Sequence, residues 1–137
     1  MKKPHETKTF HYHNQNPKGL KTGDCRIRAV SLATGVSWEI VVLVEALLAV
    51  KTGKMEGTPD FFDMFMQEFG HWEKHKMPKH QSGKRYKISQ LAVELKNEPN
   101  PVVVTLANHV TCIKDGKIWD TWDCGEKCVG NYWTLTQ

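Results

Sequence analysis

Cys25 has the setting that a nucleophilic cysteine requires. It directly follows Asp24, and the residues from Cys25 to Thr34 predict a short helix that Asp24 caps and Gly35 ends. At the start of a helix, free backbone N–H groups and the helix dipole lower the pKa of a thiol. The Cys25 N–H is also free to donate to an oxyanion. We therefore predict that Cys25 is a nucleophile for acyl transfer, with a buried structural cysteine as the competing interpretation.

A base and a residue to orient it lie in the C-terminal third of the chain. Asp115-Gly116 predicts a β-hairpin with a two-residue loop. In that register His109 and Asp120 are diagonal neighbours on one face, within reach of a carboxylate–imidazole hydrogen bond. We expect His109 to act as the base for Cys25 and Asp120 to orient it. A three-residue loop would put Asp123 opposite His109 instead, so Asp123 is the alternative acid.

Three segments carry a resemblance to a known family. They are Gly-Asp-Cys-Arg-Ile-Arg-Ala at 23–29, Asn-His-Val at 108–110, and Asp-Gly-Lys-Ile-Trp-Asp-Thr-Trp-Asp at 115–123. The chain resembles the small bacterial and phage-encoded papain-like cysteine peptidases. The Asp-Cys pair is also similar to that of bacteriocin-leader peptidase domains and NlpC-type cell-wall peptidases, and the order Cys, His, Asp agrees with theirs.

This resemblance covers the chain from about Tyr12 to Trp133. It implies a papain-like fold and a Cys-His-Asp triad that hydrolyses a peptide or amide bond through a thioester. It also implies a peptide or protein substrate and no metal or organic cofactor. One position departs from the pattern, because papain-like enzymes often carry an oxyanion-stabilising Gln six residues before the Cys, and that position here is Gly19. Of the amides further upstream we choose Asn16 as the oxyanion donor.

Two other functions compete with the hydrolase. Cys124 and Cys128 have a C-x3-C spacing and, with Cys112 and His109, could bind zinc. On one strand, however, Cys112 and His109 are an odd number of residues apart and point to opposite faces, so zinc is the weaker interpretation. The other alternative is a non-catalytic binding module on the same fold.

Helical patterns come first in the chain and strand patterns second, which predicts an α+β fold with N-terminal helices packed on an antiparallel sheet. Residues 1–23 are a polar lead-in with a short extended piece at 9–13. The helix that begins at Trp38 is apolar nearly all round and is expected to be deeply buried. Helices are predicted at 25–34, 38–51, 60–69 and 90–96, and strands at 102–113, 117–123 and 129–135.

The composition is that of an ordinary globular protein. The chain has 137 residues, of which 39% are hydrophobic and 25% charged, and we expect a single domain over residues 1–137. No apolar run opens the chain, and the longest one, 40–50, is too short to span a bilayer. We therefore expect a cytoplasmic protein with reduced thiols and no membrane partner. The net charge is +4, but no aromatic-rich strand motif interleaves with the basic residues. No nucleic-acid partner is therefore expected.

Overall fold

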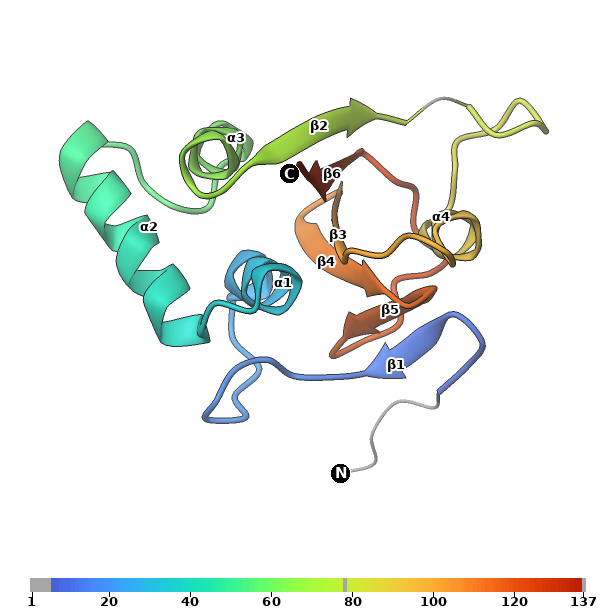
Figure 1. Ribbon diagram of the computed structural model, residues 1–137, viewed down its shortest axis with the longest axis horizontal. Coiled ribbons are helices and arrows are strands. Elements are labelled where there is room, and N and C mark those ends of the chain that lie inside the picture. The colour runs from blue at the N-terminus through green and yellow to red at the C-terminus, as the bar shows by residue number, and fades with distance from the viewer. Residues whose placement is uncertain (1–5, 78, 137) are drawn as a thin grey trace.

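A mixed sheet runs through the computed structural model, which describes residues 6–77 and 79–136; residues 1–5 of the predicted lead-in, Pro78 and Gln137 lie outside the described residues. The sheet has six strands in the order β1-β5-β4-β3-β6-β2 (Figure 1). The strands are β1 (Phe10–Tyr12), β2 (Trp72–Lys76), β3 (Val102–Leu106), β4 (His109–Lys114), β5 (Lys117–Asp120) and β6 (Asn131–Leu135). The helices are α1 (Cys25–Thr34), α2 (Trp38–Thr52), α3 (Pro59–Glu68) and α4 (Ile88–Glu94). The α+β class predicted from the sequence is confirmed.

The hairpin between β4 and β5 has the predicted two-residue loop. Asp115 and Gly116 both have positive φ, 53° and 75°, as a type I′ turn requires. Lys114 pairs with Lys117, and the register continues to Cys112 opposite Trp119. This confirmed register fixes which side chains of β5 share a face with those of β4.

The predicted strand 102–113 is wrong as one element, because a second tight turn divides it. β3 and β4 form a hairpin in which Leu106 pairs with His109. Asn108 lies in this turn with φ 57°, a left-handed conformation that Asn tolerates better than most residues. The turn therefore places His109 at the first position of β4, at the end of the sheet.

The sheet is mixed rather than purely antiparallel. The extended piece predicted within the lead-in becomes β1, which pairs in parallel with β5, so that Tyr12 lies opposite Asp120. Every other pairing is antiparallel. Phe10 is fully buried and anchors β1. The expectation of an antiparallel sheet missed the pairing of this strand with β5, because a parallel pairing has no local turn signal.

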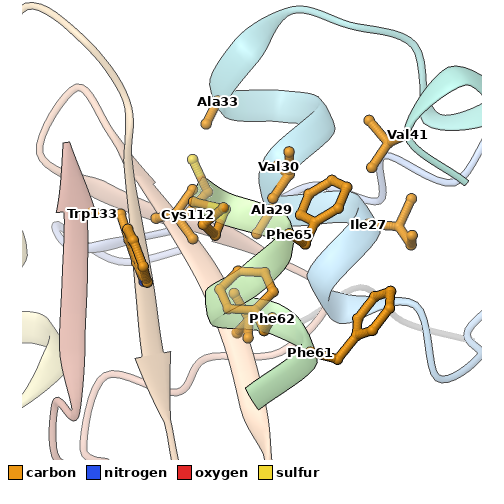
Figure 2. Close-up of a cluster of buried hydrophobic side chains, with 13 residues drawn as sticks. Ile27, Ala29, Val30, Ala33, Val41, Phe61, Phe62, Phe65, Cys112 and Trp133 are labelled. Atoms are coloured by element: carbon orange, nitrogen blue, oxygen red, sulfur yellow. The ribbon is translucent and has the colours of Figure 1, made fainter. Parts of the chain in front are cut away.

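Two hydrophobic cores cover the two faces of the sheet. Val103 belongs to the core under α1 and α3, whereas Val102 and Val104 belong to the core under α4, as strand alternation requires. Figure 2 shows Phe62 and Phe65 of α3 between α1 and Trp133. α1 packs directly against β4, which brings the first turn of α1 to the end of the sheet where His109 lies.

The expected deep burial of α2 is wrong. Only Val41 and Glu45 of this helix are buried, and a row of apolar side chains along its outer face is exposed: Ile40, Leu43, Leu47 and Val50. α2 contacts α1 but lies away from the sheet (Figure 1), so a helix that is apolar all round has only one covered side. Within residues 6–77 and 79–136, no single helix meets the length and hydropathy of a membrane span; only the bent pair α1 and α2, taken together, does.

Candidate active site

Cys25 is the first residue of α1, as the sequence predicts. Asp24 occupies the N-cap position, but its carboxylate makes no capping hydrogen bond to the helix. The prediction that Asp24 caps α1 through its side chain is therefore wrong. The N–H groups of the first helical turn have no intrahelical acceptors, and they stabilise negative charge on or near the Cys25 sulfur.

His109 connects Cys25 to Asp120. The Cys25 thiol and the His109 imidazole are close enough for each group to shift the pKa of the other. His109 Nε2 lies 2.6 Å from Asp120 Oδ2, which leaves Nδ1 for the sulfur. His109 and Asp120 are both buried, and the exposed Trp122 ring lies against the imidazole with 4.9 Å between ring centroids. The three residues therefore lie in a row that begins at the N-terminus of α1, and the His109–Asp120 step of it is a hydrogen bond.

The protonation states of Cys25 and His109 are coupled. Burial raises the pKa of the Cys25 thiol, but the hydrogen bond and charge of His109, with contributions from the Val110 backbone and Arg26, outweigh it and leave the pKa below its ordinary value. Burial lowers the pKa of His109, but hydrogen bonds and charges from Asp120 and Cys25 outweigh it and raise the pKa to about 9. The arrangement favours a thiolate and an imidazolium at neutral pH.

Asp120 also belongs to a buried ionic network on the side of its carboxylate away from His109. Arg28 donates from Nη2 to Asp120 Oδ1 over 3.3 Å and from Nη1 to Asp24 Oδ1 over 2.7 Å. The backbone N–H of Thr121 also donates to Asp120 Oδ1, over 2.7 Å. Asp24 Oδ2 accepts from the indole N–H of Trp38 over 2.9 Å. Asp24 therefore faces Arg28 and Trp38 rather than the helix terminus, which explains its failure as a side-chain cap.

The sequence analysis missed the part of Arg28 in this network. Asp24 and Arg28 are four residues apart, the spacing that places an acidic and a basic side chain together on a helix. This spacing is a signal in the sequence that predicts the contact between Asp24 and Arg28. The contact between Arg28 and Asp120 joins positions 92 apart in the chain and has no local signal.

Of the other predicted site residues, Asn16 joins this network and Asp123 does not. Asn16 is buried, and its amide donates to Asp24 Oδ2 over 3.1 Å, so that it holds the residue before Cys25. Asp120 bonds to His109, whereas Asp123 accepts from the backbone N–H of Gly125 over 2.9 Å. The oxyanion role of Asn16 and the catalytic roles of the triad stay predictions.

The cysteines proposed as zinc ligands are spread over the molecule. Cys112 belongs to the core under α1 and α3, Cys124 to the core on the other face, and Cys128 is exposed. Among the described residues, the one cluster of three potential ligands is His109, Asp120 and Cys124, whose ligand atoms lie within 4.8 Å of one another. A zinc site built from Cys112, Cys124 and Cys128 is therefore not formed, and Cys124 instead lies close to two members of the predicted triad.

Two depressions meet at His109. One, of about 430 Å³, is lined by Cys25, His109, Trp122 and the segment 21–23. The other, of about 220 Å³, is lined by His109, Val110 and side chains from α3, β2 and β6. Asn108 and His109 line both depressions, and Cys25 lines the larger one.

Comparison with protein-family models, with curated proteins and with solved structures finds no match to this chain.

Proposed function

We propose that this protein is a papain-like cysteine hydrolase that cleaves a peptide or amide bond through a thioester on Cys25. The observation that supports this most directly is the chain of contacts from Cys25 through His109 to Asp120, with the sulfur at the N-terminus of α1. A nucleophile, a base and an orienting carboxylate in this order are the parts that acyl transfer needs.

In the first half of the reaction, the Cys25 thiolate attacks the carbonyl carbon of the substrate and forms a tetrahedral intermediate. The N–H groups at the start of α1, that of Cys25 first, stabilise the negative charge that develops on the carbonyl oxygen. The His109 imidazolium then gives its proton to the leaving amine as the C–N bond breaks. The products of this half are the free amine and a thioester on Cys25.

In the second half, neutral His109 takes a proton from water, and the hydroxyl attacks the thioester carbonyl. The C–S bond breaks, the acid product leaves, and the thiolate–imidazolium pair is restored. Asp120 keeps the imidazole oriented through both halves, because its Oδ2 fixes Nε2 and leaves Nδ1 facing the sulfur. Trp122 covers one side of the ring and limits its rotation.

The proposal is tested by alkylation with iodoacetamide, with each cysteine followed by mass spectrometry. Wild-type Cys25 should react at pH 6, where an ordinary thiol is protonated, and His109→Ala should lose this reactivity. Hydrolysis of a mixed peptide library should fall to background in Cys25→Ala, while Cys128→Ala, which removes an exposed cysteine away from the site, should retain wild-type turnover. Turnover by folded Cys25→Ala, or ordinary thiol behaviour of Cys25, would refute the proposal.

A metal centre at His109, Asp120 and Cys124 is the second candidate, because their ligand atoms are so close. Three features weigh against it. Zinc with bonds of about 2.0–2.2 Å in a tetrahedral site holds two ligand atoms roughly 3.3 Å apart, whereas His109 Nε2 and Asp120 Oδ2 are 2.6 Å apart. Burial raises the pKa of the Cys124 thiol to about 12, and Arg28 already neutralises Asp120.

Elemental analysis distinguishes the two candidates. Protein produced in zinc-supplemented medium and then desalted should contain far less than one zinc per chain if the site is a hydrolase. A stoichiometric zinc content that is lost in Cys124→Ser and kept in Cys128→Ser would establish the metal centre instead.

A further inference from the structure

The smaller depression beside His109, called here the Arg26 pocket, is rich in hydrogen-bond donors. Arg26, Lys74, Asn108 and Asn131 line it together with the apolar side chains of Phe62 and Leu106. Its volume is about 220 Å³, many times the ~10–15 Å³ needed to hold one water. That is room for one side chain of moderate size, directly next to the imidazole that serves the nucleophile.

Arg26 has a donor that the described residues leave unused. It follows Cys25 in the chain, and its side chain is only 17% exposed. Its Nε is buried and has no hydrogen-bond partner among residues 6–77 and 79–136. Its nearest acidic contact, Nη1 to Glu56 Oε1, is 3.7 Å long, which is an ion pair but not a hydrogen bond. A buried N–H without an acceptor is costly. Nη1, which is ion-paired with Glu56 but not hydrogen-bonded to it, has N–H groups to offer an occupant of the pocket.

The Arg26 pocket is lined by more basic than acidic side chains. Arg26 and Lys74 are basic, and the imidazolium of His109 forms one wall. Asp63 is the one carboxylate that lines the pocket, and its Oδ2 accepts from Lys74 Nζ over 3.0 Å. Basic side chains at the pocket thus outnumber its one carboxylate, which is paired with Lys74, while Arg26 makes a longer ion pair with Glu56.

We infer that the Arg26 pocket receives an acidic side chain, Asp or Glu, of the substrate residue next to the scissile bond. The inference rests on the proposed function, since it takes Cys25 as the nucleophile. The carboxylate would accept from Arg26 and lie near Lys74, while its methylene groups pack against Phe62 and Leu106. The protein would then be selective for acidic sites in its peptide or protein substrates.

The test uses short peptidyl fluoromethyl ketones, which alkylate an active-site thiolate. One panel carries Glu, Gln, Lys or Leu at the residue bearing the ketone, and a second carries the same four at the residue before it. The rate constant for labelling of Cys25 is measured by intact-mass spectrometry. In one of the two panels, Glu should label at least about tenfold faster than Gln, and Lys should be the slowest.

Three variants assign the preference to the pocket. Arg26→Gln should reduce the Glu-to-Gln ratio to near one, and Lys74→Gln should reduce it by a smaller factor. Lys51→Gln makes the same change of net charge at an exposed position of α2 that does not line the pocket, and it should leave the ratio unchanged. Because Arg26 also lowers the pKa of Cys25, every rate is divided by that variant's iodoacetamide rate.

The iodoacetamide rates keep this inference separate from the proposed function. If Cys25 lacks enhanced reactivity toward iodoacetamide, the hydrolase itself fails. If Cys25 is activated but neither panel favours Glu over Gln, or the ratio survives in Arg26→Gln, the Arg26 pocket has been assigned wrongly and the hydrolase stands. Activated Cys25 that no ketone labels would also overturn the assignment.

Discussion

Arg28 donates a hydrogen bond, 3.3 Å long, to the carboxylate of Asp120 that orients His109. The same guanidinium bonds to Asp24, the residue before Cys25. The two ends of the predicted triad, the helix start that carries the sulfur and the strand end that carries the acid, are thus joined by one buried cation. Its removal should disturb both stability and activity.

Arg28→Met should lower the free energy of unfolding by about 3–5 kcal/mol, because it leaves two buried carboxylates without their cation. Arg28→Lys should cost less but should still reduce turnover, since an ammonium cannot bridge the two carboxylates as the guanidinium fork does. Urea denaturation followed by tryptophan fluorescence measures the effect. Lys18→Met, an exposed position, should change stability by less than about 0.5 kcal/mol. An Arg28→Met protein within 1 kcal/mol of wild type would show that the ion pair is unimportant.

Asp120→Asn should reduce kcat/KM by about 10²-fold or more, because an amide neither fixes the imidazole tautomer nor stabilises the imidazolium. It should also lower the pKa of His109, so that the imidazolium stabilises the Cys25 thiolate less and alkylation of Cys25 begins at a higher pH than in wild type. Rates of iodoacetamide alkylation between pH 5 and 10 measure this shift. Asp123→Asn is the matched control, and it should resemble wild type because Asp123 bonds to a backbone N–H of its own turn. A larger loss in Asp123→Asn would reverse the assignment.

The parts of this site that could be predicted have local causes. Gly35 ends the helix that Cys25 begins, and Asp115-Gly116 can form a type I′ turn whose register decides between Asp120 and Asp123. Each of these signals acts over a few residues and needs no partner from elsewhere in the chain.

The parts that could not be predicted depend on distant partners. Asp24 has the residue type of a helix cap, but Arg28 and Trp38 take its carboxylate. α2 has the composition of a buried helix, yet composition does not determine what packs on its second side. The turn at Asn108 lacks a glycine, so a continuous β-branched run concealed it.

Cys25→Ala should change how stability depends on pH. The lowered pKa of Cys25 and the raised pKa of His109 favour a thiolate and an imidazolium in the folded wild type, while the unfolded chain between pH 6.5 and 8.5 holds mainly thiol and neutral imidazole. Each state carries one proton on the pair, so the pair adds no slope. Without the thiol, Asp120 still raises the pKa of His109. A raised pKa contributes stability that is complete below the unfolded value of 6.5 and is lost as pH rises through the folded value.

The Cys25→Ala variant should therefore lose stability relative to wild type by about 1–2 kcal/mol between pH 6.5 and 8.5. Urea unfolding at several pH values measures the difference, in which contributions from other titrating groups cancel. Cys128→Ala should follow the wild-type curve. Parallel curves for Cys25→Ala and wild type would mean that thiolate and imidazolium do not form a pair in the folded protein.

Glu45→Gln should stabilise the protein at high pH. Glu45 is buried on α2, and its Oε2 has no hydrogen-bond partner within the described part of the chain. Burial, and then repulsion by Glu56, raise its pKa to about 7 from 4.5. The folded state therefore loses stability as pH rises from 4.5 through 7, because the carboxylate must ionise in a buried site.

The neutral amide avoids this ionisation, so Glu45→Gln should gain about 1–3 kcal/mol over wild type at pH 8.5 and almost nothing at pH 4.5. Glu39→Gln, an exposed change in the first turn of the same helix, should give no gain at either pH, since an acidic residue there interacts favourably with the helix dipole. Urea unfolding of wild type and both variants at pH 4.5 and pH 8.5 measures these differences in the free energy of unfolding. An equal gain at both would trace the effect to packing rather than to charge, because only ionisation distinguishes one pH from the other.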